Sequence, residues 1–344
     1  MRHFLRDAIV QNRRASPVKA LTYNRYGPPE VIQVSEVPRP EPKPYEVLVR
    51  VHASAVNTSD WRIRAAAFPG ITALPARLIF GLCRPRNQRL GSEFAGVVET
   101  VGSQVSRFSP DQRVFGMTPK GSATAEYVAI SESGAVAEIP EGLSFNEAAA
   151  LPFGGLAALV FLEQFAALRA DQHVLIVGAS GGVGSYAVQI AKAGSAHVTG
   201  VSGPDNQDFV KGLGADHTVN YQATDLGSIN GRFDLILDTV GVVSPRLSRH
   251  LLHPGGLFLP LNIGLREMGA ALLNPLRSRK IRLGVNSNTA NDLERLVELV
   301  RAGSLRPVID SVFGMQAAAA AHYLVERRHR TGAVILEVER AEPA

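Results

Sequence analysis

The 344-residue sequence predicts an α/β protein that combines a doubly wound parallel sheet with a partly open β-barrel. Three observations support this fold class. Residues 18–140 contain short apolar strands separated by glycine and proline, strands alternate with helices from residue 144, and residues 286–344 are too short for a core of their own. We therefore expect an N-terminal extension (1–17), a nucleotide-binding domain (144–285) and a discontinuous barrel domain (18–143 and 286–344).

The composition is that of a globular protein: 45% of the residues are hydrophobic and 19% are charged. The net charge of +5 and the pI of about 9.5 fit an anionic small ligand but give no indication of nucleic-acid binding. The single cysteine, Cys83, excludes a disulfide framework and a cysteine-rich zinc site, and we expect it to be structural or incidental. No apolar run reaches the roughly 18 residues of a membrane span.

Residues 1–17 contain four arginines and one acid, Asp7. Mitochondrial targeting segments have this kind of composition, but chain termini are also frequently short surface extensions. We favour a short surface extension or an upstream start codon over a targeting segment, and expect a cytoplasmic protein.

In the first part of the chain, partial alternation of apolar and polar residues predicts strands over 18–23, 31–34 and 46–52. Turns are expected at 27–29 and in the proline-rich stretch 38–44. Further strands are predicted over 94–101 and 113–117. These short strands are typical of a barrel.

In the second part, Ser144 and Glu147 have the spacing of a capping box and predict a helix start. Helices are predicted over 183–193 and up to 214, where glycine ends the pattern. The strands expected between them span 173–177, 197–201, 218–221, 233–238, 256–262 and 280–285. The tail predicts helices at 291–302 and 316–328 and strands at 308–313 and 333–338, which we expect to pack back onto the barrel.

The motif with the clearest chemical meaning is Gly178-Ala-Ser-Gly-Gly-Val-Gly184, which follows a strand and begins a helix. Small residues allow the backbone to approach a diphosphate, and the amides of a helix N-terminus stabilise its charge. A purely structural strand-to-helix turn is the alternative. The surrounding βαβ pattern favours the dinucleotide site.

The choice of dinucleotide depends on the end of the second strand, Val201-Ser202-Gly203. NAD enzymes place a carboxylate here for the ribose 2′-hydroxyl, and its absence leaves room for a 2′-phosphate. Asp205 lies close in sequence and weakens the argument, but NADPH is favoured over NADH. The predicted cofactor-binding residues are Ser180, Gly181, Gly182, Val183, Ser202, Asn206, Tyr221, Val240 and Asn262.

The sequence resembles the medium-chain dehydrogenase/reductases, and more closely their zinc-free, quinone oxidoreductase-like branch. The resemblance covers residues 18–339 and implies a GroES-like catalytic domain, a Rossmann nucleotide domain and an active site in the cleft between them. Its markers are Tyr26-Gly-Pro-Pro-Glu-Val31, Glu46-Val-Leu-Val-Arg-Val51, Ala55-Val-Asn-Thr-Ser-Asp-Trp61, Gly91-Ser-Glu-Phe-Ala-Gly96, Ala148-Ala-Ala-Leu-Pro152, the glycine motif, Leu213-Gly-Ala-Asp216 and Leu237-Asp-Thr-Val-Gly241.

Zinc-dependent relatives have a cysteine ligand where this chain has Asn57 and a histidine ligand where it has Ser92. Asp60 and Glu93 remain nearby, but two carboxylates without imidazole or thiolate make a poor zinc site. We therefore expect no zinc.

Without zinc, the resemblance implies a substrate that already accepts hydride readily, a quinone or an α,β-unsaturated carbonyl. The expected catalytic residues are Asn57, Asp60 and Arg62. Asn57 can donate to a developing oxyanion, or it can only brace a turn; Asp60 can act directly or order its loop. Arg62 replaces an aromatic hydroxyl that is common in the branch, while Ala157 replaces a threonine and Ala333 a lysine.

Two alternatives to a quinone or enone reductase stay open. One is a zinc-free alcohol or aldehyde reductase, and the other is a non-catalytic NADPH-binding sensor or interaction protein, which the replaced side chains keep possible. The expected partner in either enzyme is a small electrophilic substrate. The resemblance also implies a homodimer joined at the edge strand 281–285. The basic stretches 84–89 and 277–282 can be solvated loops or anion-binding segments.

Overall fold

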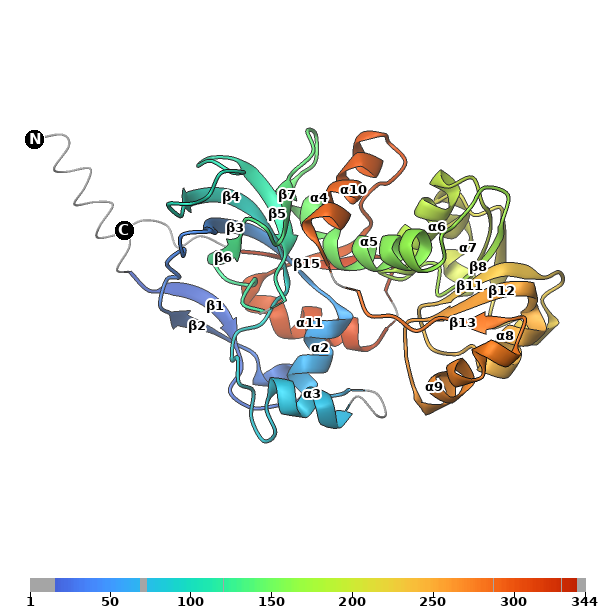
Figure 1. Cartoon of the computed structure of the whole chain (residues 1–344). Coiled ribbons are helices and arrows are strands. Elements are labelled where there is room, and N and C mark those ends of the chain that lie inside the picture. Colours follow the sequence, from blue (N-terminus) through green and yellow to red (C-terminus); the bar gives the residue numbers. More distant parts are fainter. Residues whose placement is uncertain (1–15, 69–72, 120, 287, 329, 339–344) are drawn as a thin grey trace, which may run out of the picture.

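The computed structural model describes residues 16–338 apart from 69–72, 120, 287 and 329. The two larger of its three sheets lie in the two halves of the molecule (Figure 1), which confirms the predicted α/β class with a barrel domain and a parallel-sheet domain. The predicted extension 1–17 lies outside the described residues except for its last two. Within the described residues, no helix combines the length and apolarity that crossing a membrane requires.

The barrel domain is built on a seven-stranded sheet. Its order is β14 (Ile309–Gly314), β15 (Ala333–Glu337), β3 (Glu46–Val56), β4 (Glu93–Val101), β5 (Arg113–Met117) and β7 (Ala135–Glu138), and β6 (Tyr127–Ser131) pairs with β3. Only β14 and β15 are parallel in this sheet. The inward side chains of β3, such as Val47, Val49 and Val51, pack with Phe94 in one core. A hairpin of β1 (Val18–Thr22) and β2 (Gln33–Val37) joins it through Leu21.

The nucleotide domain has six parallel strands in the order β10 (His217–Asn220), β9 (His197–Ser202), β8 (His173–Val177), β11 (Phe233–Asp238), β12 (Leu252–Pro260) and β13 (Lys280–Ile281). The chain therefore reverses direction across the sheet between β8 and β11, the point where such sheets bind ligands. Val174 and Ile176 face one core and Leu175 faces the other, so β8 is buried on both sides. The connecting helices are α6 (Gly184–Ala193), α7 (Gln207–Gly212), α8 (Pro245–Leu251) and α9 (Leu265–Leu272).

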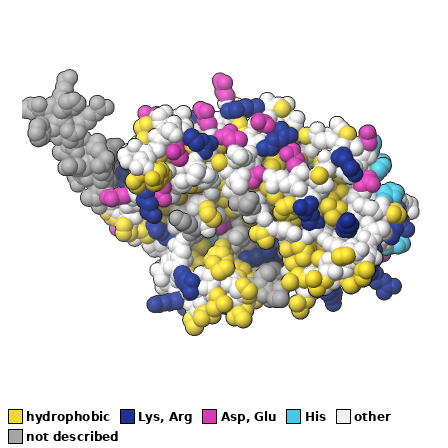
Figure 2. Space-filling view, in the orientation of Figure 1, with side chains coloured by type: hydrophobic (Ala, Val, Ile, Leu, Met, Phe, Trp, Pro, Cys, Tyr) yellow, Lys and Arg dark blue, Asp and Glu magenta, His cyan; other side chains and the backbone are white. Residues whose placement is uncertain are grey.

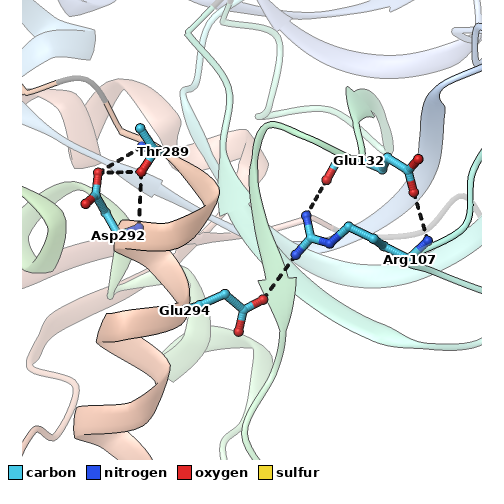
Figure 3. A network of polar contacts seen from close by, with 5 residues as sticks. All are labelled: Arg107, Glu132, Thr289, Asp292 and Glu294. Atoms are coloured by element: carbon cyan, nitrogen blue, oxygen red, sulfur yellow. Dashed lines mark hydrogen bonds and ion pairs between the residues drawn. The ribbon is translucent and has the colours of Figure 1, made fainter.

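The tail returns to the barrel, as the sequence predicted. After β13, helix α10 (Ala290–Arg301) begins with a capping box between Thr289 and Asp292 and packs beside β7. Figure 3 shows its outer contact, in which Arg107 donates to Glu294 at 3.2 Å and to the main chain of Glu132. β15 then inserts between β14 and β3. The division points at 143/144 and 285/286 stay predictions.

The last strand of the nucleotide domain is shorter than predicted: β13 ends at Ile281, whereas the prediction extended to residue 285. The chain turns away because Arg282 donates to the carbonyl of Phe165 and Gly284 lies directly against the Phe165 ring. β13 is nevertheless the edge of its sheet. The predicted homodimer at this edge stays a prediction.

Two helices of the barrel domain are joined by a buried charge. Arg64 of α2 (Thr58–Ala65) has no solvent exposure and pairs with Glu326 of α11 (Ala318–Glu326), whose side chain is 36% exposed. His322 of α11 lies nearby, and burial and then the Arg64 charge lower its pKa to about 3. The guanidinium therefore depends on Glu326 for its only ion pair among the described residues.

We expect Glu326→Ala to lower the free energy of unfolding by about 2–3 kcal/mol, because it leaves a buried cation without its partner; the solvent-exposed side of the pair keeps the loss at the low end for buried pairs. Glu294→Ala removes an exposed pair and should cost less than about 1 kcal/mol. Urea unfolding followed by circular dichroism measures both. Equal losses would contradict the buried position of Arg64.

Candidate functional site: the cleft between the two domains

The glycine motif forms the turn between β8 and α6. Gly178 has a φ of +81°, and a Cβ on Gly184 would lie 2.0 Å from the Gly178 carbonyl oxygen, so the turn itself requires both glycines. Gly181 and Gly182 differ, because a Cβ on either would have no protein atom closer than 3.4 Å. Their missing side chains keep the backbone of the loop uncovered. This arrangement, flanked by Ser180 and Val183, fits a dinucleotide diphosphate.

Two further predicted residues lie beside this loop, after β11 and β12. Asp238, at the end of β11, accepts hydrogen bonds from the amides of Val240, Gly241 and Val243 and so fixes a turn. Val240 is exposed and lies next to Gly178, while Asn262 lies next to Gly241. The carboxyl ends of neighbouring parallel strands thus bring these side chains to the point where the strand order reverses.

The end of β9 differs in part from the expectation. Ser202 is buried, and its hydroxyl accepts from Gln207 at 2.7 Å and points toward the Gly203 carbonyl, because Gln207 folds back from the start of α7. The hydroxyl is therefore engaged within the protein and is not presented to a 2′-phosphate. Tyr221 is 49% exposed beside Gly203 and presents the accessible hydroxyl at this strand end. The side chain of Asn206 accepts from Thr331.

The tail supplies a contact that the sequence analysis missed. Just before β15, the amide of Gly332 donates to the carbonyl of Ser180, so this segment crosses the glycine loop. Arg330 donates to the carbonyl of Val56, and a Cβ on Gly182 would lie 3.5 Å from its guanidinium. A cation from the barrel domain therefore lies at the loop that fits a diphosphate. The sequence analysis noted Ala333 in this stretch, but the residue that reaches the glycine loop is Arg330, three positions earlier.

On the opposite wall, Asn57 begins α2. Its side-chain oxygen Oδ1 accepts from the main-chain amides of Ser59 and Asp60. Its side-chain nitrogen Nδ2 donates to Ser92 at 2.7 Å and to Glu93 at 2.8 Å. All of its polar atoms are thus bonded within the protein. Direct donation to a substrate oxyanion would require one of these bonds to break, so the geometry favours the bracing alternative.

Asp60 and Glu93 form a buried carboxyl pair behind Asn57. Asp60 accepts from the main-chain amide of Asn57, and Glu93 accepts from the main-chain amide of Phe153 at the start of α5 (Pro152–Leu159). Burial raises the pKa of Asp60 to about 7 and that of Glu93 to about 8, while hydrogen bonds and the nearby Arg330 oppose the rise. The pair therefore titrates close to neutral pH.

Arg62 reaches from α2 across the cleft and donates to the side chain of Asn262 at 2.8 Å. The structure thus brings together a residue predicted as catalytic and one predicted to bind the cofactor. Its guanidinium and that of Arg328 each lie 5.8 Å from the Trp61 ring. Burial and then the Arg328 charge lower the pKa of Arg62. This wall of the cleft is therefore positively charged.

The described residues contain no group of three or more His, Cys, Asp or Glu side chains that could hold a metal ion. What the cleft offers is an open phosphate loop, a strand end without carboxylate, buried titrating carboxyls and arginines. These are the parts of a dinucleotide site, with the residues predicted as catalytic on the facing wall.

Comparison with known proteins matches this geometry. Residues 43–171 match the family profile described as "Alcohol dehydrogenase GroES-like domain", and residues 213–336 match "Zinc-binding dehydrogenase". The chain is 33% identical to "Quinone-oxidoreductase QR1, chloroplastic" of Triphysaria versicolor over 93% of this chain and 98% of that protein. This chain belongs to the medium-chain dehydrogenase/reductase family. Within that family it falls in the quinone oxidoreductase-like branch.

Other medium-chain relatives agree. The human "NAD(P)H oxidoreductase RTN4IP1, mitochondrial" is 30% identical, with 94% of this chain and 90% of that protein covered. The quinone oxidoreductase of Coxiella burnetii has the same fold, with a TM-score of 0.84, 29% identity and coverage of 94% of this chain and 100% of that one. The chain is therefore an NAD(P)H-dependent oxidoreductase. The relatives' names place those proteins in chloroplasts or mitochondria, and the cytoplasmic location of this one stays a prediction.

We expect Gly181→Ala to leave the fold intact but to weaken dinucleotide binding at least tenfold, or about 1.4 kcal/mol, because its methyl group would lie on the uncovered face of the loop. Gly184→Ala is the matched control. Its Cβ would clash with Gly178 and should lower the melting temperature without any ligand. Thermal unfolding and fluorescence titration with NADPH separate the two effects. Unchanged binding by Gly181→Ala would argue against a diphosphate at this loop.

Glu93 generates a prediction on pH. A carboxyl whose pKa is raised on folding contributes stability that is complete below its unfolded pKa, near 4, and is lost as the pH rises through about 8. The Glu93 carboxyl should therefore cause the unfolding free energy to fall by on the order of 3 kcal/mol between about pH 5 and pH 8. Glu93→Gln should remove this part of the fall. The exposed Glu294→Gln should leave the slope unchanged. Urea unfolding at a series of pH values tests this, and identical slopes in all three proteins would contradict it.

Proposed function

We propose that the protein transfers hydride from NADPH to a quinone or an α,β-unsaturated carbonyl. The observation that carries the cofactor preference is the end of β9, which has no carboxylate and lies beside the exposed hydroxyl of Tyr221. A 2′-phosphate fits there, whereas an NAD site needs an acid for the ribose. The substrate class is supported by the names of relatives at 29–33% identity that are called quinone oxidoreductases.

In this proposal the loop at Gly181 and Gly182 would hold the diphosphate, with the Arg330 cation beside it, and Tyr221 would contact the 2′-phosphate. Val240 and Asn262 would line the nicotinamide end of the site. When bound, the nicotinamide supplies the hydride. The chain's own contribution is to align the two reactants and to exclude wrong orientations.

Arg62 is the residue best placed to act on the substrate. A guanidinium stays charged near neutral pH, so it stabilises negative charge on a substrate oxygen and is a poor proton donor. The proton that completes the reduction would then come from water. Asn57, Asp60 and Glu93 are positioning residues in this scheme, since their hydrogen bonds hold the start of α2, and with it Arg62, against the cleft.

The first test is titration with NADPH and NADH, followed by stopped-flow oxidation of the bound cofactor by a quinone and by an enone. We expect NADPH to bind at least tenfold more tightly, and Tyr221→Phe to reduce that preference. Arg62→Gln keeps a donor for Asn262 but removes the charge, so hydride transfer should slow by about 100-fold with little change in NADPH affinity.

Other outcomes would change the proposal. Equal affinity for the two dinucleotides would remove the NADPH assignment. Turnover of simple alcohols or aldehydes alone would favour the alcohol or aldehyde reductase. Tight NADPH binding without oxidation by any electrophile would favour the non-catalytic sensor.

A further inference from the structure

Exposed apolar side chains gather on two short helices. Helix α3 (Ala73–Phe80) has no buried residue, and its Leu74 and Ile79 are both 66% exposed. Helix α9 buries only Ala270, while Leu272 is 81% exposed and Leu276, just beyond the helix, is 84% exposed. The two helices lie at the lower edge of both domains in Figure 1, and Figure 2 shows apolar side chains along that edge. Apolar patches of this kind mark interaction surfaces.

The charges of the chain are segregated around the same helices. The segment between Asp60 and Glu93, which contains α3, has six arginines and no acid; one of them, Arg64, is buried and paired with Glu326. The segment between Asp238 and Asp292, which contains α9, has seven Lys or Arg and one acid, Glu267. The rest of the chain has 23 Lys or Arg and 30 Asp or Glu. In Figure 2 the acidic side chains accordingly lie mainly on the opposite, upper side.

The single acid of these segments is held within its own helix, since Glu267 accepts from the amide of Gly264 at the start of α9. Arg84 and Arg266 are exposed. The face formed by α3, α9 and these two arginines, here called the apolar–basic face, thus combines exposed apolar side chains with positive charge.

We propose that the apolar–basic face docks on the surface of an anionic lipid bilayer. Leucine and isoleucine side chains insert at the boundary of headgroups and acyl chains, and arginine and lysine bind anionic headgroups. A helix of eight residues cannot cross a bilayer but can lie in its interface. A second copy of the chain is a poorer occupant, because two faces of the same sign repel each other.

The position of this face deepens the proposed function, on which the following step rests. Arg62 and Asn262, which meet across the cleft, lie on the segments that lead into α3 and α9. A docked protein would therefore hold its cleft close to the membrane surface. The substrate class that this arrangement suits is an amphiphilic quinone with an apolar tail.

The test is co-sedimentation of the full chain with vesicles of phosphatidylcholine alone or with roughly one third phosphatidylglycerol. We expect binding only to the anionic vesicles, with weakening at high salt. The variant with both Leu272→Ser and Leu276→Ser, and the variant with both Arg84→Glu and Arg266→Glu, should each reduce binding at least tenfold. Tyr45→Ser and Arg301→Glu, exposed residues outside the face, are matched controls and should bind as the unchanged protein does.

Equal binding to neutral vesicles, no binding, or equal loss in the control variants would overturn the proposal. So would a dimer in light scattering that Leu272→Ser and Leu276→Ser dissolve, if the unchanged protein does not bind vesicles, since a second copy would then cover the face. Oxidation of NADPH by a short, water-soluble quinone should be the same in the leucine variants. That assay reports on the proposed reaction separately, because vesicle binding needs no turnover.

Discussion

A buried carboxyl group organises the cleft. Glu93 has almost no contact with solvent, and a carboxyl in such a place is tolerated only when hydrogen-bond donors surround it. One donor is the side-chain amide of Asn57, the residue that begins α2. The other is the main-chain amide of Phe153 at the start of α5. Strand β4, the helix that carries Arg62 and the helix that packs on α6 are thereby held in one arrangement.

The cleft also depends on how the two sheets are connected. The six parallel strands place Gly178, Val240 and Asn262 at the carboxyl end of the sheet, as any doubly wound sheet of this order would. The barrel domain also contacts this end of the sheet, because the segment Arg330–Gly332 crosses the glycine loop and hydrogen-bonds to Ser180. A dinucleotide held at this loop would therefore contact both domains, and its binding would favour one relative position of the two.

Much of the fold could be predicted from the sequence, for local physical reasons. Strand β8 is a continuous apolar run after His173, Gly178 and Gly184 are required by the turn that they form, and the capping box at Ser144 does start a helix. The short helices α3 and α9 were not predicted, since they contain Pro75 and Gly269 and bury little of their surface. β13 ends early because of Phe165, a contact between residues more than a hundred positions apart.

The site was predictable in the same uneven way. The structure brings the predicted residues at strand ends and in the glycine loop to one end of the sheet, because the sheet order determines their positions. Which partners these side chains bind depends on the folded structure. Asn57 is hydrogen-bonded to Glu93 and Ser202 to Gln207. Arg330 lies against a loop about 150 positions earlier in the chain. No local pattern contains that information.

The insertion of β15 between β14 and β3 has a consequence for the protein during synthesis. β3 pairs with β4 and β6, which follow it closely in the chain, but its third partner, β15, ends at Glu337, so synthesis must pass residue 337 before the sheet is complete. Until then, the stretch Ala53–Val56 of β3 lacks its β15 partner, whereas β6 already pairs with Glu46–Arg50, and unpaired strand segments invite pairing with other chains. The continuous nucleotide domain can fold in the meantime, so the first half of the chain emerges first and is finished last.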